Sequence, residues 1–511
     1  MPQTHVNEFD VIVVGSGIGG LVSATQLAAK GAKVIVLEKY LIPGGSAGYF
    51  DRKGYRFDVG ASMIFGFGQQ GTTNLLSRAL AAVDTSLEVI PDPVQIHYHL
   101  PDDLNIKVHK DYQQFLQELI EYFPKEEKGI RRFYGECWQV FNCLNQMELL
   151  SLEEPRYLFK SFVNHPNACL GLLKYLPQNV GDIARKYIKD PLLLKFIDIE
   201  CYCWSVVPAN MTPMINAGMV FSDRHYGGVN YPKGGVGKIA QKLVEGLLRT
   251  GGNIQFKAKV QRILIEEGRA VGVKLVNGTQ YYAQRIVSNA TRWDTFDKLI
   301  PPEKIAIREK KRQNKWQKNY QKSPSFLSLH MGVRAEVITE RTDCHHIFLE
   351  SWKDMEAPFG TLFVSIPTLL DSSLAPEGKH IIHSFTPDWV DSWEGLTSKE
   401  YTNRKENIAG QIIDRLEKIF PGLNAGLDYL EIGTPKTHRK FLGREDGTYG
   451  PIPQRKLPGL LKMPFNRTKI PGLYCVGDST FPGQGLNAVA FSGFACAHRI
   501  AADLGLKKAS F

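Results

Sequence analysis

The segment that most constrains this chain is Phe9–Lys39, which reads FDVIVVGSGIGGLVSATQLAAKGAKVIVLEK. Val11–Val14 is a continuous β-branched run, typical of a strand that is buried on both faces of a parallel sheet. A glycine-rich turn and a helical pattern follow, and Gly31 ends the helix before a second apolar run, Lys33–Leu37. This order predicts a strand, a turn, a helix and a parallel strand at the start of the fold.

The glycines of this turn, Gly15, Gly17 and Gly20, have the spacing G-x-G-x-x-G. In this pattern the first glycine permits a tight turn, the second lets the backbone approach a pyrophosphate, and the third lets the helix pack closely. The helix N-terminus then directs its unpaired N–H groups toward the phosphates. Glu38 closes the second strand, where a carboxylate can accept a hydrogen bond from a ribose hydroxyl. The segment therefore predicts a dinucleotide site, because a turn that only packs would not need the terminal acid.

Length and charge set wider limits. At 511 residues the chain exceeds the roughly 250 to 300 residues at which a single core stops growing, so we expect two domains. The formal net charge of +10 is compatible with nucleic acid, an anionic membrane or a merely basic enzyme. Nothing beyond this charge supports nucleic-acid binding, and we predict no such partner. The eight cysteines lack C-x-x-C pairs and zinc-type histidine spacing, which predicts reduced thiols and no metal site.

The sequence also predicts neither a targeting segment nor a membrane span. The dinucleotide unit begins at Phe9, so we expect no signal or transit peptide. Of two long uncharged stretches, the one at 11–29 is the glycine motif itself. The other, Cys201–Ser222, contains Pro208 and Pro213 and would make a poor spanning helix.

A second glycine-dense segment runs from Leu41 to Phe67. Gly44, Gly45 and Gly48 would let the backbone come close to a ligand. A short strand at 55–59 would deliver the next residues, 60–62, to the same place. Because the segment is rich in large apolar residues, we interpret it as a loop that lines the site rather than a mobile surface loop.

From 73 to 220 the sequence becomes helical, aromatic and basic, which predicts an inserted region with helices at 111–123 and 132–150. Arg156–Trp204 mixes leucines and aromatics with lysines, and fits either a core with extended lysines or a surface that enters lipid. The basic stretch Pro301–Lys322, around Trp316 and Tyr320, fits either a solvated helix or a patch for anionic lipid.

A pattern typical of nucleotide-binding domains recurs at Tyr231-Pro-Lys-Gly-Gly. It is followed by a helix and by strands at 259–266, 270–276, 279–283 and 286–290. Strand-like runs between 323 and 434, with a helix at 403–419, predict the sheet of another domain. We therefore predict a discontinuous nucleotide-binding domain of residues 1–72, 225–300 and 440–511. Residues 73–224 and 301–439 would form the second domain, which faces the substrate and a membrane.

The C-terminal segment 472–489 predicts the other half of the ligand site. A buried strand ends at Gly477-Asp478, and a turn at 483–486 leads into a helix of small residues. Asp478 could hold a sugar-like chain, and this helix N-terminus would also face the ligand. Two such elements at opposite ends of the chain favour FAD, with its adenosine and pyrophosphate at the first motif and its isoalloxazine near Gly485. No second G-x-G-x-x-G supports an NAD(P) site.

These motifs, with Pro43-Gly44-Gly45, Asp58-Val-Gly60-Ala and Tyr231-Pro-Lys-Gly-Gly, resemble the phytoene desaturase-type branch of FAD-dependent amine oxidase-like enzymes. Segments 449–459 and 482–493 are most similar to its carotenoid (prolycopene) isomerases. The resemblance implies an α/β fold: a Rossmann-like FAD-binding domain of the glutathione reductase/amine oxidase type with an inserted α+β domain. The expected FAD-binding residues are Gly15, Gly17, Gly19, Gly20, Glu38, Lys39, Gly44, Gly45, Ser46, Gly60, Ala61, Ser62, Val260, Ala290, Gly477, Asp478, Gly485, Leu486 and Asn487. Ser46 departs from the basic residue usual in bacterial desaturases, which weakens a desaturase assignment.

The resemblance implies that a poly-cis carotene such as prolycopene becomes all-trans lycopene without net redox change. Our hypothesis is that reduced FAD is itself the acid and base, so an external electron donor is needed and no side-chain catalyst is predicted. Glu200, Asp223 and His225 could assist, although we expect structural roles for them. The expected location is peripheral, on the cytoplasmic side of a photosynthetic (thylakoid) membrane.

Three other functions compete with isomerisation. A carotene desaturase would pass hydride to the flavin and lower the product mass by two hydrogens per step. An FAD-dependent saturase would raise the product mass. A non-catalytic prenyl-lipid carrier could use the same fold without bound FAD.

Overall fold

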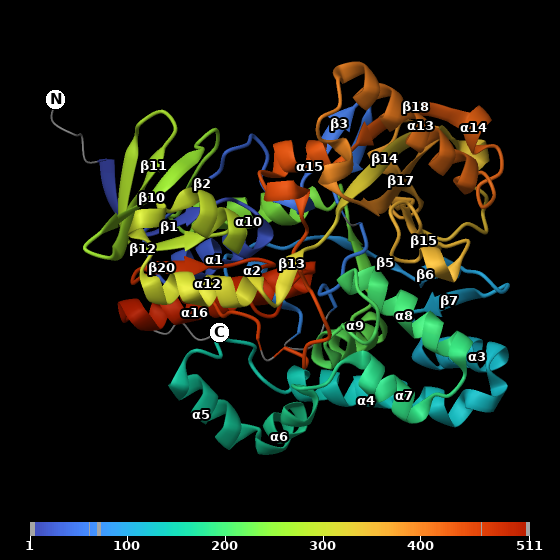
Figure 1. Cartoon of the computed structure of the whole chain (residues 1–511), viewed down its shortest axis with the longest axis horizontal. Helices are drawn as coiled ribbons and strands as arrows, with labels where there is room; N and C mark the ends of the chain where they lie inside the picture. Colours follow the sequence, from blue (N-terminus) through green and yellow to red (C-terminus); the bar gives the residue numbers. More distant parts are fainter. Residues whose placement is uncertain (1–5, 61, 69–72, 461, 507–511) are drawn as a thin grey trace.

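The computed structural model describes residues 6–60, 62–68, 73–460 and 462–506, and two large sheets organise them (Figure 1). The strands are β1 (Val6–Val14), β2 (Val34–Leu37), β3 (Tyr49–Arg52), β4 (Tyr55–Asp58), β5 (Val89–Asp92), β6 (Val94–His99), β7 (Asn105–His109), β8 (Val229–Pro232), β9 (Asn253–Gln255), β10 (Val260–Glu266), β11 (Arg269–Leu275), β12 (Gln280–Ser288), β13 (Tyr320–Lys322), β14 (Ser325–Arg334), β15 (His345–Phe348), β16 (Leu362–Ser365), β17 (Lys379–Asp388), β18 (Leu427–Gly433), β19 (Pro451–Pro453) and β20 (Leu473–Cys475).

Helices flank both sheets. They are α1 (Ile18–Ala29), α2 (Leu75–Ala81), α3 (Tyr112–Tyr122), α4 (Glu127–Asn145), α5 (Pro155–Asn164), α6 (Pro166–Tyr175), α7 (Val180–Tyr187), α8 (Pro191–Ser205), α9 (Met214–Tyr226), α10 (Gly237–Arg249), α11 (Arg292–Asp294), α12 (Ile307–Gln317), α13 (Ser398–Leu416), α14 (Leu423–Gly426), α15 (Pro435–Leu442) and α16 (Leu486–Leu504). Among the described residues, no helix combines the length and the apolar character needed to cross a bilayer.

The first sheet contains the predicted βαβ unit. Its strand order is β10-β11-β12-β1-β2-β9, with β20 also paired to β12. Strand β1 is parallel to β2 and β12, and Val11–Val14 is fully buried, as its β-branched run predicts. Its two faces contribute to two different cores, one of which includes α1 and α16. The Rossmann-like character of this part of the fold is therefore confirmed.

One strand of this sheet differs from the prediction. The sequence predicts separate strands at 279–283 and 286–290, whereas the structure has one continuous strand, β12. All of β12 pairs in parallel with β1, while its other edge pairs first with β11 and then with β20. Because one edge changes partner midway, the hydrophobic pattern also changes there, although the backbone stays extended.

The second sheet has the order β18-β14-β17-β16-β15-β6-β7. Helix α13 covers one face, where Ile412 and Leu416 share a core with Leu329. Helices α3, α4 and α8 share the other core with Tyr98 and Phe363 (Figure 1). Two distant parts of the chain, 94–109 and 325–433, thus build one sheet.

The purely helical interpretation of residues 73–220 is wrong for β5, β6 and β7. The apolar residues Ile96 and Tyr98 alternate with polar ones, and so do Ile106 and Val108. A turn with positive φ at Asp102 (63°) and Asp103 (57°) connects β6 and β7. These are the features of a hairpin with one buried face.

Helices α1 and α16, almost 470 residues apart, pack directly against each other. A Cβ at Gly493 would lie 2.6 Å from the main-chain oxygen of Gly19, so these glycines let the two helices approach closely. This contact explains the small residues of the last helix. It also brings the two ends of the chain together at one site.

Candidate functional site

A cavity of about 1680 Å³ lies where the first and last glycine motifs meet. It runs from these motifs along α9 to the inserted helices α5 and α6. It therefore has a polar, glycine-rich end and a long apolar part.

The first motif builds one wall of the polar end. Gly15 has φ +94°, a conformation that side chains rarely adopt, and Gly17 is the N-cap of α1. Gly44 forms a bridge with Gly17 and donates its N–H to the Ser16 oxygen at 2.9 Å. The segment 44–46 thus lies against the phosphate-type turn, as the loop interpretation predicts.

Glu38 lies at the end of β2 beside this turn and is buried. One carboxylate oxygen accepts the Ser16 N–H at 2.8 Å and its hydroxyl at 2.7 Å, and the other accepts the Tyr40 N–H at 2.8 Å. A carboxylate offers about four acceptor positions, so one more donor can be accommodated. Lys39 also lines the cavity, donates to the Lys440 oxygen at 3.0 Å, and has its pKa lowered by burial.

The C-terminal motif builds the facing wall. Strand β20 leads into Gly477 (φ +99°), and Asp478 forms an ion pair with Arg444. Gly485 (φ +103°) is the N-cap of α16, and a Cβ there would meet nothing within 4 Å. The first turn of α16 therefore directs unpaired N–H groups into the cavity. Two helix N-termini face one space.

Most of the predicted cofactor-binding residues line this cavity. They are Gly15, Gly17, Gly19, Glu38, Lys39, Gly44, Gly45, Ser46, Ser62, Val260, Ala290, Gly477, Asp478, Gly485, Leu486 and Asn487. Gly20 and Gly60 stand behind the wall: a Cβ would lie 2.5 Å from the Gly15 oxygen and 2.6 Å from the Ser46 oxygen, respectively. Ala61 lies outside the described residues.

A buried carboxyl group, Asp58, holds the second glycine-dense segment in place. It accepts hydrogen bonds from Tyr231 at 2.8 Å, Ser62 at 2.9 Å and the Val236 N–H at 2.9 Å. Burial raises the pKa of Asp58 to about 6. Hydrogen bonds to Asp58 therefore connect the Asp58-Val-Gly motif to the Tyr231-Pro-Lys-Gly-Gly segment, and this contact fixes the position of both.

Several polar residues of the cavity wall were not predicted from the sequence. Asn289 fills the space beside the first turn, since a Cβ at Gly17 would lie 2.5 Å from its amide nitrogen. Arg444 brings a guanidinium group to the cavity. The His438 ring is hydrogen-bonded to the Tyr449 hydroxyl at 3.0 Å and to the Ser328 hydroxyl at 3.3 Å. Only Asn289 had a local indication, because it follows a buried strand.

The rest of the cavity is mainly apolar and aromatic. Its lining includes Phe65, Leu149, Trp204, Phe363, Phe385 and Phe481. Leu158 of α5 and Leu173 of α6 line the cavity and are also exposed, by 43% and 56%. This part of the cavity wall is therefore accessible to solvent.

Of the three groups that could assist, only Asp223 reaches the cavity. Glu200 is fully buried, paired with Arg224 at 2.7 Å and hydrogen-bonded to Tyr134 at 2.5 Å. The ring of His225 is hydrogen-bonded to the Lys110 oxygen at 3.2 Å, and burial lowers its pKa to about 3. The structural roles expected for Glu200 and His225 agree with these contacts.

Asp223 has a different environment. It is 1% exposed, lines the cavity, and neither carboxyl oxygen has a hydrogen-bond partner within the described part of the chain. Burial raises its pKa to about 7. An apolar cavity thus contains one acid that is largely protonated below neutral pH.

Comparison with known proteins identifies the family. The model of the flavin containing amine oxidoreductases matches residues 18–501. The chain is 59% identical to the chloroplastic prolycopene isomerase of Arabidopsis thaliana, over 98% of this chain and 84% of that protein. It is 60% identical to prolycopene isomerase 1 of an Oncidium hybrid, over 99% and 86%. A solved putrescine oxidase shares the fold, with a TM-score of 0.64 at 14% identity over 98% of this chain and all of that one. This protein therefore belongs to the flavin-containing amine oxidoreductase family, on the branch formed by the prolycopene isomerases.

Proposed function

We propose that this enzyme isomerises poly-cis carotenes, converting prolycopene to all-trans lycopene with FAD and without net redox change. The single observation that carries the proposal is the continuous cavity, which joins two dinucleotide-type turns to a long apolar chamber. The high identity to prolycopene isomerases supports this substrate.

The residues present fit FAD. The glycines of the first turn leave open space at the N-terminus of α1, where pyrophosphate oxygens would accept hydrogen bonds from main-chain N–H groups. Glu38 would hold the ribose and Asp478 the ribitol. The buried Asn487 side-chain oxygen has no partner among the described residues and lies in the first turn of α16, where the isoalloxazine would bind.

Arg444 would supply the positive charge near the pyrophosphate that Ser46 lacks. The resemblance places a basic residue after the glycine doublet in bacterial desaturases, and this chain has Ser46 there. Arg444 comes from another part of the chain, lines the same cavity and is paired with Asp478. A guanidinium group binds phosphate oxygens well, so it would balance the pyrophosphate charge.

The apolar chamber suits the substrate because a carotene has no charge and no hydrogen-bonding group. Rotation about a C=C bond needs a transient loss of double-bond character, which protonation of the polyene provides. When bound, the reduced flavin supplies both the acid and the base. The chain's own residues hold the polyene straight and exclude water, and Asp223 adds to the cavity wall a buried carboxyl group whose pKa is raised to about 7.

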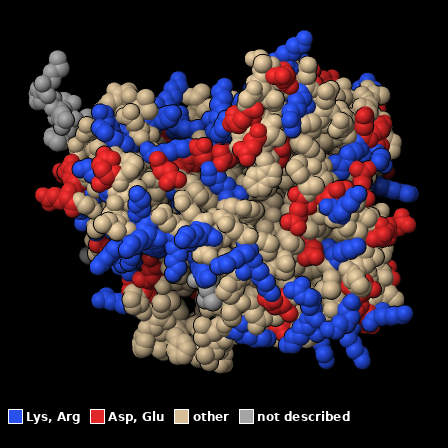
Figure 2. Space-filling model, viewed as in Figure 1, with Lys and Arg blue, Asp and Glu red and all other residues tan. Residues whose placement is uncertain are grey.

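Docking on a membrane would deliver this substrate. Leu158, Phe159, Phe162, Val163, Leu170 and Leu173 of α5 and α6 are 43 to 73% exposed. The two helices project from the lower edge of the fold, and Figure 2 shows little charge there (Figure 1). Because Leu158 and Leu173 also line the cavity, we place its mouth at this edge, which would sit in the near leaflet of the bilayer. Residues 73–224 and 301–439 would form the substrate-binding domain.

The second predicted docking segment, Pro301–Lys322, does not present its aromatic side chains to lipid. Trp316 is 5% exposed and packs against Trp293 with the two rings tilted and their centroids 4.6 Å apart, and Tyr320 is also buried. Aromatic insertion at α12 is therefore wrong, because these rings complete an internal cluster. The exposed lysines of α12 remain, and Figure 2 shows them as a basic surface.

The test uses the flavin-loaded protein with prolycopene in liposomes, under anaerobic conditions, with and without a reductant. We expect all-trans lycopene of unchanged mass, formed only when the flavin is reduced. A loss of two hydrogens per step would instead identify a desaturase, and a gain would identify a saturase.

Two further outcomes would contradict the proposal in different ways. Full-rate isomerisation with oxidised FAD and no reductant would overturn the acid–base role of the reduced flavin. Stoichiometric polyene binding by a protein that takes up no flavin would indicate a carrier.

A further inference from the structure

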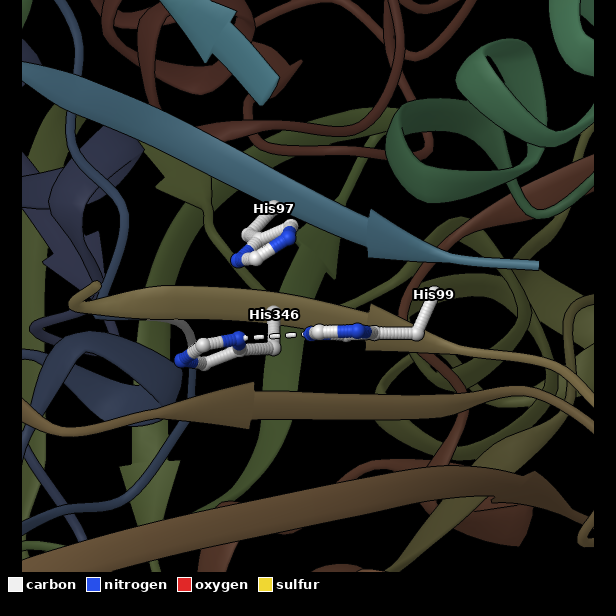
Figure 3. A group of neighbouring side chains, drawn as sticks. All are labelled: His97, His99 and His346. Carbon is white, nitrogen blue, oxygen red and sulfur yellow. Dashed lines mark hydrogen bonds between the residues drawn. The ribbon is translucent and has the colours of Figure 1, made fainter. Parts of the chain in front are cut away.

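Three histidines meet on the second sheet, away from the flavin motifs. His97 and His99 are two residues apart on β6, so both side chains point to the same face. On the neighbouring parallel strand β15, His346 pairs directly with His97 in the register. Figure 3 shows His99 and His346 extended toward each other, with the His97 ring beside them.

The spacing of these rings suits one metal ion. The His99 Nε2 and His346 Nδ1 atoms are 3.0 Å apart, and one nitrogen from each of the three rings lies within 4.8 Å of the others. In a tetrahedral zinc site with Zn–N bonds of about 2.0 to 2.1 Å, ligand nitrogens are about 3.3 Å apart. The nitrogens of His99 and His346 are already close to this separation, and a nitrogen of the His97 ring lies within 4.8 Å of both.

Asp343 orients two of the rings. The His346 Nε2 atom is 2.8 Å from the main-chain oxygen of Asp343, so it donates its proton there and Nδ1 keeps its lone pair. The His97 Nδ1 atom is 3.0 Å from the Asp343 carboxylate, which leaves Nε2 with a lone pair. A carboxylate or carbonyl behind each ring is the arrangement found around metal-bound histidines.

The surroundings provide an entry path and further support. His97 and His99 are partly exposed, whereas His346 is buried against Phe420. Lys107 is paired with the Asp343 carboxylate at 2.9 Å, so its charge is compensated. Asn105 of β7 contacts His97 Nε2 directly, so a metal ion bound at this nitrogen would displace the Asn105 side chain.

We propose that His97, His99 and His346 bind one divalent transition metal ion, zinc by ligand preference, as a structural site. Three neutral imidazoles favour zinc, copper, nickel or cobalt over magnesium or calcium. The ion would join β6 to β15, and these strands have only three residue pairs in register. It would thereby fasten the hairpin of residues 94–109 to the sheet of residues 325–433. The sequence predicted no metal site because the ligands are almost 250 residues apart.

The test first removes metal from the flavin-loaded full chain with a chelator. Zn²⁺ or Co²⁺ is then added, and the bound metal is measured. We expect one equivalent of Zn²⁺, a higher melting temperature with Zn²⁺, and tetrahedral visible bands when Co²⁺ replaces it. His97→Gln and His99→Gln should abolish all three effects, and Asp343→Asn should weaken affinity about 10- to 100-fold. His109→Gln, on β7 beside Glu118, is the matched control and should bind normally.

A further variant separates a lost ligand from a misfolded protein. His99→Cys replaces an imidazole with a thiolate, so its Co²⁺ complex should gain a sulfur-to-cobalt charge-transfer band in the difference spectrum. No stoichiometric metal in the wild type, or unchanged binding in His97→Gln/His99→Gln, would overturn the proposal. So would a Co²⁺ spectrum of His99→Cys without the new band.

Discussion

At the scale of single residues, Asp223 makes a distinct prediction for stability. Its pKa of about 7 in the folded state is above the usual value of about 4, so the folded protein binds this proton more tightly than the unfolded chain does. Its contribution to the free energy of unfolding is therefore full below about pH 4 and is lost as the pH rises to about 7. Asp223→Asn cannot ionise and should lack this loss.

Urea unfolding of both proteins at about pH 5 and pH 8 tests this prediction. The advantage of Asp223→Asn over the wild type should grow by about 2 to 3 kcal/mol between these pH values. Parallel pH dependence in the two proteins would mean that the carboxyl group is not desolvated.

The buried ion pair of Glu200 and Arg224 predicts that a substitution lowers stability. Both side chains are 0% exposed, and Arg224 also lies over the rings of Phe115 and Phe221. Glu200→Gln leaves an unpaired buried guanidinium and should lower the free energy of unfolding by about 3 to 5 kcal/mol. The isomer formed by the surviving folded fraction should not change.

Chemical denaturation with product analysis checks this, and Glu245→Gln is the matched control. Glu245 pairs with Arg249 on the surface, where water screens the two charges, so its loss should leave the free energy of unfolding almost unchanged. A change of product geometry in Glu200→Gln would instead give Glu200 a role in catalysis.

The residues predicted from sequence share one property. Gly15, Gly17 and Glu38 belong to a local pattern in which each spacing has a physical reason, and the structure gathers them at the cavity. Arg444 and His438 could not be predicted, because their roles depend on neighbours that only the tertiary fold supplies. The acid Asp223 was noticed, but its burial could not be known from its helix alone.

At the scale of elements, the contact between α1 and α16 positions both cavity-facing N-termini. Gly493→Ala would place a Cβ 2.6 Å from the Gly19 oxygen and 2.8 Å from Val22. A backbone oxygen cannot turn away, so the helices must separate. We expect a loss of about 1 to 3 kcal/mol and a lower flavin content, measured by thermal unfolding and by absorbance.

Gly410→Ala is the control for helix propensity. Gly410 lies on the exposed side of α13, and an added Cβ would meet nothing within 4 Å. This change should raise stability by about 0.5 to 1 kcal/mol. Equal effects of the two substitutions would show that the α1–α16 contact tolerates a methyl group.

Helices and strands were predicted well where one hydrophobic periodicity continued along the whole element. They were predicted poorly where a short strand pairs with a strand far away in the sequence. The pattern of α10, with Ile239, Leu243 and Leu247, continues to its end and predicts the helix correctly. By contrast, β6 pairs with β15 far along the chain and β7 pairs with β6, and the helical patterns on both sides obscured the short alternation of these two strands.

At the scale of the whole molecule, α5 and α6 predict how the enzyme meets lipid. Replacing Phe159, Phe162 and Leu173 by serine removes large exposed apolar side chains from α5 and α6, and Leu173 also lines the cavity. Partitioning onto neutral liposomes should fall at least about tenfold, because each buried aromatic side chain contributes about 1.5 to 3 kcal/mol. Co-flotation with liposomes measures this, and turnover of a detergent-solubilised carotene should fall much less.

Ile307→Ser and Leu248→Ser are the matched controls, since both side chains are exposed, by 75% and 52%, but lie elsewhere. They should leave flotation unchanged. Equal losses in the controls would assign binding to general surface hydrophobicity rather than to this edge.

The pairing of β20 with β12 also has a consequence for biosynthesis. The ribosome makes the first glycine turn long before residues 473–504, which form the wall that faces it. A nascent chain can therefore form only half of the flavin site until α16 has left the exit tunnel. Stable flavin incorporation thus has to wait for the folding of α16.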